Sequence, residues 1–220
     1  MWALQPMTVA VGGEKTAVDL QGKVLAPSPE LKLDDSPLFV TGPLTGLPPP
    51  PRGTEAILAD SVRDFSDRQG GGGWFYGVFK GQSTAFSPLP ACTATDWKQE
   101  WSGDHPYISL TAQDQHPSAD GGTPISAVRC WKSDYDGSVR IKGQFRGGVE
   151  GDGVGVSILV DGRRRFRKLL GGGNPVVENF DFTQAVRPGT EIEFAVDPGP
   201  ATDIDFDATQ VSVTILGRAR

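Results

Sequence analysis

Apolar and polar residues alternate in four stretches of the C-terminal half, and this pattern most constrains the fold. The stretches are Gly137–Phe145, Val154–Asp161, Thr190–Asp197 and Gln210–Leu216. In the third, Ile192, Phe194 and Val196 share one face. A period of two residues predicts half-buried β-strands. No stretch sustains a helical period over three turns, so we expect a fold without helices.

Turn-forming dipeptides stand at the ends of these stretches. They are Asp136-Gly137, Asp161-Gly162, Pro188-Gly189 and Pro198-Gly199. Asp-Gly between alternating runs is a hairpin signal, because both residues tolerate the positive φ of the tight turn. Strands at this spacing favour a sandwich or a jelly roll. The sequence therefore predicts an all-β antiparallel β-sandwich of the jelly-roll kind.

The segment from Asp60 to Gly77 adds a strand, a polar turn, four glycines and an aromatic strand that starts at Trp74. Its counterpart is Ala127–Trp131, which precedes the next alternating stretch. The glycine runs Gly70–Gly73 and Gly171–Gly173 do not precede a helical pattern. They are therefore read as hairpin tips and not as phosphate-binding loops.

Four consecutive prolines at 48–51 divide the chain. Such a run is stiff and extended, and it cannot occupy a central strand. We expect a partial β appendage over residues 1–47, a linker over 48–53 and a β-sandwich module over 54–220. Short strands are predicted in the appendage at Met7–Val11, Thr16–Leu20 and Leu31–Val40. Met1 is read as an added start, so the missing signal peptide is discounted.

Composition narrows the classes of partner. The 220 residues carry a formal net charge of −6, which disfavours nucleic acid, and no apolar run is long enough to span a membrane. A basic run, Arg163–Arg165 with Arg167 and Lys168, is read as a solvated hairpin arm, with a site for acidic polysaccharide as the alternative. Cys92 and Cys130 are compatible with one disulfide or with two buried thiols.

Several short pieces resemble β-sandwiches attached to bacterial carbohydrate-degrading enzymes. In the module they are Asp64–Ser66, Gly73–Gly77, His116-Pro117, Ala127–Trp131, Gly151–Val154, Phe194–Gly199 and Asp205–Thr209. In the appendage, Val18–Gly22 and Leu31–Val40 resemble the last strands of the accessory β-domain that follows the catalytic barrel in several glycoside hydrolases. The resemblance implies a carbohydrate-binding-module-like sandwich at the C-terminus of a secreted, multidomain bacterial glycoside hydrolase.

Exposed aromatic rings are the residues that would bind a sugar, because they stack on its C–H faces while polar neighbours bond its hydroxyls. Trp97, Trp101 and Tyr107 lie in the polar stretch TDWKQEWSGDHPY, which we read as a loop. Trp74 and Tyr76 are further candidates, although the strand context of Trp74 also suits a core residue. We expect a carbohydrate site formed by these five residues.

Alternate aspartates in the stretch DIDFD suggest a structural Ca²⁺ site. The ion takes six to eight oxygen ligands, and Asp203, Asp205 and Asp207 are the predicted ligands. The alternative is that Asp203 and Asp205 are solvated and Asp207 caps a turn. His105 and His116 are too few for a catalytic zinc, and no pair of carboxylates is singled out by spacing. No catalytic residue is therefore predicted.

These observations lead to three hypotheses of function. The first is a non-catalytic carbohydrate-binding module that targets an attached glycoside hydrolase to polysaccharide outside the cell. The second is a structural sandwich that packs on the catalytic domain and has no sugar site. The third is an enzyme, a jelly-roll glycosidase or a polysaccharide lyase. A groove lined by exposed aromatic residues would favour the first.

Overall fold

The computed structural model describes residues 7–10, 16–18, 30–33, 39–41, 55–95 and 98–218. The chain divides into two compact units, Met1–Thr54 and Glu55–Arg220. In the first unit, β1 (Met7–Ala10) pairs with β3 (Glu30–Leu33), and β2 (Thr16–Val18) pairs with β4 (Phe39–Thr41), both antiparallel. The predicted strand Leu31–Val40 thus contributes to two short strands. The predicted linker at 48–53 lies outside the described residues.

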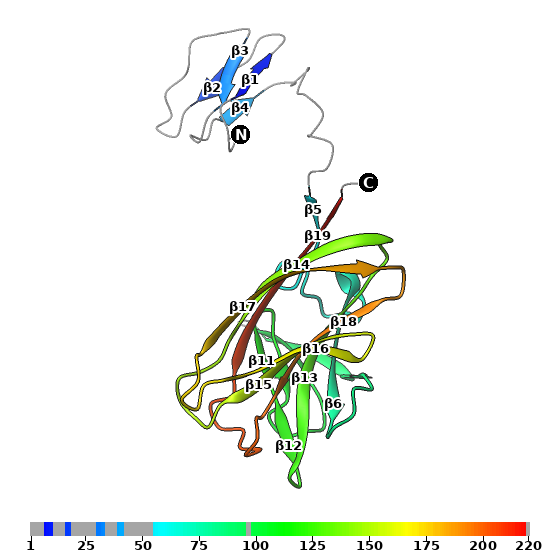
Figure 1. The fold of residues 1–220 in the computed structure, drawn as a ribbon, viewed down its shortest axis with the longest axis vertical. Coiled ribbons are helices and arrows are strands. Elements are labelled where there is room, and N and C mark those ends of the chain that lie inside the picture. The colour runs from blue at the N-terminus through cyan, green and yellow to red at the C-terminus, as the bar shows by residue number, and fades with distance from the viewer. Residues whose placement is uncertain are drawn as a thin grey trace. The chain divides into compact units, whose positions relative to one another are not determined.

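The second unit is a sandwich of two antiparallel sheets (Figure 1). The eight-stranded sheet has the order β17-β14-β19-β11-β10-β9-β8, with β5 also paired to β19. Its strands are β5 (Glu55–Asp60), β8 (Ala91–Ala94), β9 (Gln99–Ser102), β10 (Ser109–Leu110), β11 (Asp114–His116), β14 (Gly137–Arg146), β17 (Val177–Val186) and β19 (Thr209–Arg218).

The seven-stranded sheet has the order β16-β15-β18-β13-β6-β7, with β12 paired to β13. Its strands are β6 (Trp74–Lys80), β7 (Ser87–Pro88), β12 (Ser118–Asp120), β13 (Thr123–Lys132), β15 (Val154–Val160), β16 (Arg163–Leu170) and β18 (Glu191–Asp197). The chain passes between the sheets from β13 to β14 to β15, and again from β17 to β18 to β19. This alternation confirms the predicted jelly-roll sandwich.

The described residues contain no α-helix, and a 3₁₀ turn at Gly71–Gly73 leads into β6. No helix among them is long and apolar enough to cross a membrane. The prediction of a helix-free fold is therefore confirmed for the described part of the chain.

The core lies between the two sheets, and the alternating patterns point into it as predicted. Its buried side chains include Val139, Ile141, Phe145, Val156, Ile158, Ile192, Phe194, Val196, Val211, Val213 and Ile215. The intervening Arg140 and Lys142 on β14 are exposed. Burying apolar area stabilises the fold by about 25 cal/mol per Å², so this interface is the main source of stability.

The two Asp-Gly dipeptides behave differently. Asp161 and Gly162 both have positive φ, 49° and 70°, and they join β15 to β16 in a tight hairpin as predicted. Asp136-Gly137 joins strands of opposite sheets, so the hairpin reading is wrong there. The reason is that the register of β13 is set by β6 and β18 on its two edges, which leaves no edge for β14.

Candidate functional site

Two of the predicted carbohydrate-binding residues are core residues. Trp74 and Tyr76 lie on β6 with their side chains toward the other sheet, and both are 0% exposed. They cannot meet a ligand in this fold, so their assignment to the sugar site is wrong. The cause is the alternation of β6, in which Trp74, Tyr76 and Val78 occupy the inner face.

Trp101 is also part of the core, which corrects its prediction as an exposed stacking residue. It is 4% exposed, and its ring stacks on Tyr76 with centroids 5.5 Å apart and planes 18° apart. Its indole Nε1 donates to the carbonyl oxygen of Ser66 over 2.8 Å. Trp101 is the one buried position of β9, so this strand shows no apolar alternation in the sequence.

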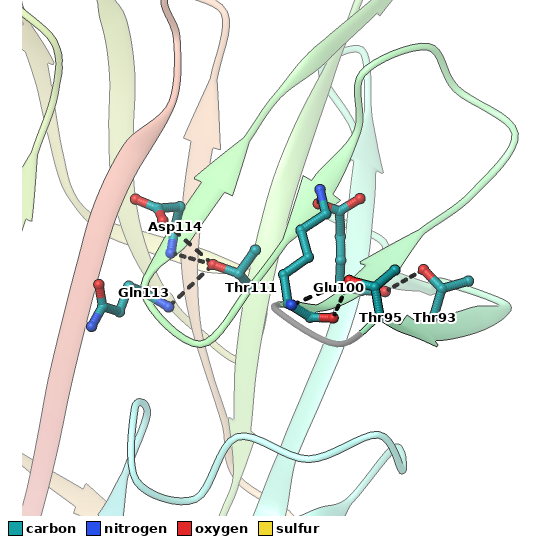
Figure 2. Close-up of polar contacts among 7 residues, drawn as sticks. Thr93, Thr95, Glu100, Thr111, Gln113 and Asp114 are labelled. Carbon is teal, nitrogen blue, oxygen red and sulfur yellow. Dashed lines mark hydrogen bonds and ion pairs between the residues drawn. The ribbon is translucent and has the colours of Figure 1, made fainter.

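The predicted loop around Trp101 is a β-hairpin made of β8 and β9. The backbone N–H of Thr95 donates to the carbonyl oxygen of Lys98 over 2.8 Å, which closes the turn. The Thr93 hydroxyl bonds the carbonyl oxygen of Glu100 across the hairpin, 3.5 Å away (Figure 2). Trp97 lies outside the described residues.

Tyr107 is the predicted aromatic residue that the structure leaves open to solvent. Its side chain is 73% exposed, and its φ is +61°, a backbone conformation that is rare for a residue with a side chain. The neighbouring backbone is anchored because the Ser118 hydroxyl donates to the carbonyl oxygen of Pro106. The turn therefore holds the phenol ring away from the core.

An open hollow of about 570 Å³ lies beside this ring, and we refer to it as the Tyr107 hollow. Its polar lining includes Lys98, Glu100, Ser102, Asp104, His105 and His116. The rings of Tyr107 and His116 have centroids 6.5 Å apart. His105 Nδ1 lies 3.8 Å from Asp120 Oδ2, and His116 Nδ1 lies 2.7 Å from the Pro117 carbonyl oxygen. An exposed ring beside carboxylate, imidazole and hydroxyl groups is the arrangement that sugars bind.

The predicted calcium ligands are only partly brought together. Asp203 and Asp205 are exposed, and Asp203 Oδ1 accepts the backbone N–H of Asp205 over 3.0 Å, as in an Asx turn. Asp207 is 1% exposed. Within residues 55–95 and 98–218, no three His, Cys, Asp or Glu side chains are grouped so that they could hold a metal ion.

Asp152, which was not among the predicted calcium ligands, has its carboxylate near Asp207. Both side-chain oxygens of Asp152 and Oδ2 of Asp207 are buried and have no hydrogen-bond partner. Burial, then the charge of Asp152, raises the pKa of Asp207 to about 7. Buried carboxylate oxygens without donors are costly, so this pair suits a bound cation.

Backbone carbonyl groups approach the same loops closely. A Cβ atom added at Gly151 would lie 2.7 Å from the carbonyl oxygen of Asp205, and one at Gly153 would lie 2.6 Å from that of Leu170. The segments 147–153, 170–174 and 205–207 therefore meet with their backbones in contact. Carboxylates together with backbone carbonyls are the ligand types that Ca²⁺ takes.

Sequence reasoning missed Asp152 because it is a single acid between two glycines, while Asp203–Asp207 has the denser pattern. The two glycines were the available signal, since they allow the close backbone approach.

The two cysteines are free thiols, so the disulfide alternative is wrong. Cys130 is buried on β13, and burial raises the pKa of its thiol. Cys92 is half-buried on β8, in the other sheet. Burial raises the pKa of the Cys92 thiol as well, so neither cysteine has the lowered pKa of a reactive thiol.

No protein-family model matches the chain, and no curated protein matches it. Among solved structures, the chain is similar to an isomalto-dextranase from Arthrobacter globiformis T6 complexed with panose, at 12% identity and a TM-score of 0.30, over 98% of this chain and 33% of that one. It is also similar to the CBM22-1 xylan-binding domain of Paenibacillus barcinonensis Xyn10C, at 10% identity and a TM-score of 0.32, over 76% of this chain and 97% of that one.

A family 35 carbohydrate-binding module from Clostridium thermocellum is similar at 11% identity and a TM-score of 0.28, over 48% of this chain and 88% of that one. The chain spans about a third of the length of the isomalto-dextranase. TM-scores this low do not establish a shared fold, so the sandwich is assigned from the strand pairing above.

Proposed function

We propose that this protein is a non-catalytic carbohydrate-binding module that holds an attached glycoside hydrolase near polysaccharide outside the cell. The observation that carries the proposal is the exposed ring of Tyr107, held by a positive φ at the edge of a polar hollow. The free energy of stacking an apolar ring on a sugar face comes from burying both surfaces. Keeping the ring fixed before binding lowers the entropy lost on binding.

The test is to replace Tyr107 by Ala and measure retention in affinity electrophoresis against a panel of neutral polysaccharides. The substitution removes the stacking surface, so retention should fall, while the melting temperature stays nearly constant because the side chain is exposed. Trp101→Ala is the contrast, because emptying a buried tryptophan site costs about 3–5 kcal/mol. Unchanged retention in Tyr107→Ala across all retained polysaccharides would favour the structural hypothesis.

We further propose that the chain alone hydrolyses nothing. The side-chain oxygens of Asp152 and Oδ2 of Asp207 are buried, and the histidines of the Tyr107 hollow contact a carbonyl and a carboxylate rather than a serine or cysteine nucleophile. Incubation with the retained polysaccharide should release neither reducing ends nor unsaturated products. Product that survives repurification would support the glycosidase or lyase hypothesis.

We propose that a structural Ca²⁺ binds between Asp152 and Asp207. The support is their three buried oxygens without a donor, together with the carbonyl groups of the adjoining loops. Ca²⁺ would neutralise the two carboxylates and fix the loops 147–153 and 205–207 to each other. The exposed Asp203 and Asp205 are left outside this ligand set.

The calcium proposal is tested by melting temperature after EDTA treatment and after Ca²⁺ is added back. A cation that binds only the native state stabilises it by mass action, so Ca²⁺ should raise the melting temperature. Asp207→Asn should abolish that rise, and Asp203→Asn, an exposed aspartate four residues away, should keep it. An equal response of both variants would contradict the proposed ligand set.

A further inference from the structure

The outer face of the seven-stranded sheet carries a second, smaller apolar cluster. Phe79, Val128, Leu159 and Ala195 are buried there, and Phe86 from the segment between β6 and β7 packs against them. That segment also reaches the β15–β16 turn, because a Cβ atom added at Gly162 would lie 3.3 Å from Thr84 Oγ1. The segment between β6 and β7 thus lies over part of this face and reaches the end of the edge strand β16.

A pocket of about 80 Å³ on this face is lined by residues of that segment and by two side chains of β16, and we refer to it as the outer-face pocket. Its floor contains the two serines Ser126 and Ser157, which are 8% and 3% exposed. The hydroxyl of Ser157 is buried and has no hydrogen-bond partner. A buried hydroxyl without a partner costs free energy, which a bound ligand would recover by bonding to it.

Two arginines of β16 border the pocket. Ser157 pairs with Arg167 and Leu159 pairs with Arg164 across the β15–β16 ladder, so both guanidinium groups stand on the same face as the serines. Arg167 Nη2 lies 3.3 Å from the carboxylate of Asp197. Among the described residues Arg164 has neither an ion pair nor a hydrogen bond, so its five N–H donors are available to a ligand.

The volume decides what part of a ligand enters. The pocket is about half the size of a ~150 Å³ cavity that binds benzene, so it admits a group smaller than a six-membered ring. A whole sugar ring is too large, whereas one substituent of a ring fits. The site therefore suits a small anionic group that projects from a larger molecule.

We propose that the outer-face pocket binds the carboxylate of an acidic sugar, a uronic acid within a polysaccharide. This inference rests on the proposed carbohydrate-binding function and adds a second site to it. Both carboxylate oxygens accept hydrogen bonds from the guanidinium fork of Arg164, and one of them also accepts the hydroxyl of Ser157 on the floor. Arginine and carboxylate match because both are planar and form two parallel hydrogen bonds.

A neutral sugar hydroxyl can accept a hydrogen bond from Arg164, but it has neither the negative charge nor the planar pair of oxygens of a carboxylate, so it binds this guanidinium group more weakly. The formal net charge of the chain, −6, opposes general attraction of an anion, so binding requires the local positive groups. Arg167 is already paired with Asp197, which leaves Arg164 as the residue that selects the carboxylate.

The experiment is an amide NMR titration at physiological ionic strength, with oligogalacturonate, matched neutral galacto-oligosaccharide and sodium sulfate as separate probes. Oligogalacturonate should shift the amide signals of Ser126 and Ser157, and the neutral oligosaccharide should not. Arg164→Gln should weaken this binding about tenfold or more, because a charge-assisted pair is lost. Arg163→Gln has the same charge change on the same strand outside the pocket lining, and it should keep the affinity within about twofold.

The outcomes separate the two proposals. If sugars shift only the amide signals of Tyr107 and its neighbours, the proposed carboxylate site in the outer-face pocket is wrong and the proposed function stands. Loss of neutral-sugar binding in Tyr107→Ala, with uronate binding intact, supports two independent sites. Sulfate shifts as large as those of oligogalacturonate, or equal affinities of Arg164→Gln and Arg163→Gln, overturn the carboxylate site. An absence of shifts with every sugar overturns both proposals.

Discussion

Both faces of the seven-stranded sheet bury polar groups, and they differ in how one key group is bonded: the inner-face guanidinium is bonded at both terminal nitrogens, although its Nε and the Nε1 of Trp74 have no partner. On the inner face, Arg129 of β13 is 0% exposed and donates three hydrogen bonds to backbone carbonyls. Its Nη1 bonds Ser61 over 3.0 Å and Ala112 over 2.9 Å, and its Nη2 bonds Thr111 over 2.8 Å. The Thr111 hydroxyl in turn accepts the backbone N–H groups of Gln113 and Asp114, which shapes the turn (Figure 2).

On the outer face, the buried polar groups are left partly unpaired. Ser157 Oγ and Glu193 Oε2 have no partner, and Glu193 Oε1 accepts the backbone N–H of Gly162 over 3.2 Å. Burial raises the pKa of Glu193 to about 7, with the Gly162 bond acting against it. Polar groups that the fold satisfies are structural, whereas unpaired ones keep their bonding capacity for a proton or a ligand.

The largest effect is expected from Arg129→Met. Burial lowers the pKa of Arg129 to about 10, so the guanidinium is still charged at neutral pH and makes charge-assisted bonds. Removing it leaves three carbonyls without this donor, at about 1–3 kcal/mol for each that becomes unsatisfied. Urea unfolding should show a loss of more than about 3 kcal/mol.

Arg164→Met is the matched control on the opposite face of the same sheet. Its side chain is exposed and has no hydrogen bond or ion pair with the described residues to lose, so the free energy of unfolding should stay within about 0.5 kcal/mol. Similar losses in both variants would show that satisfied and unpaired arginines do not differ, and the contrast between the faces would be lost.

The sandwich was predictable because the alternation of apolar and polar residues along a strand indicates which residues face the core. Val139, Ile141 and Phe145 of β14 are buried as their spacing indicates. Very short strands carry too few residues to show this alternation. In β9 a single residue, Trp101, points inward, so its polar neighbours Gln99 and Glu100 gave the segment the composition of a loop.

The site was less predictable than the fold, because exposure depends on three-dimensional neighbours. Tyr107 was recognised as a sugar-binding candidate from its polar surroundings, but its positive φ has no signature in sequence. Asp152 gains its role from Asp207, 55 positions away (207 minus 152). Ser157 and Arg164 line the same pocket because of the register of β15 and β16, which shifts between Ile158 and Leu159.

An intermediate effect is expected from Glu193→Gln, and it depends on pH. The pKa is raised from 4.5 to about 7 on folding, so the native state retains a proton that the unfolded state releases. The stability that this group contributes is complete below about pH 4.5 and is lost as pH rises to about 7. Gln carries no proton to lose, so the variant should show a flatter stability curve over this window in urea unfolding at each pH.

Glu191→Gln is the control for this curve, since Glu191 is two residues away on β18 and less buried. It should leave the slope between pH 4.5 and 7 close to that of the parent protein. A parent slope that survives in Glu193→Gln would mean that the buried carboxyl is ionised throughout, and that the outer face satisfies it after all.

The smallest effect, and the sharpest test of the comparison, is expected from Ser157→Ala. Its hydroxyl is buried without a partner, so removing it should leave the protein equally stable or more stable by up to about 1 kcal/mol. Ser133→Ala is the matched control. This serine directly follows β13 and is 3% exposed, and its hydroxyl donates to the carbonyl oxygen of Tyr135 and accepts the N–H of Tyr135, both over 3.0 Å. Losing those bonds should cost about 1–2 kcal/mol. If the two substitutions change the free energy of unfolding in opposite directions in urea, the Ser157 hydroxyl is not retained for stability. An equal loss of stability in Ser157→Ala and Ser133→Ala would show that the fold already satisfies the Ser157 hydroxyl. That hydroxyl would then no longer be a ligand-binding group of the outer-face pocket.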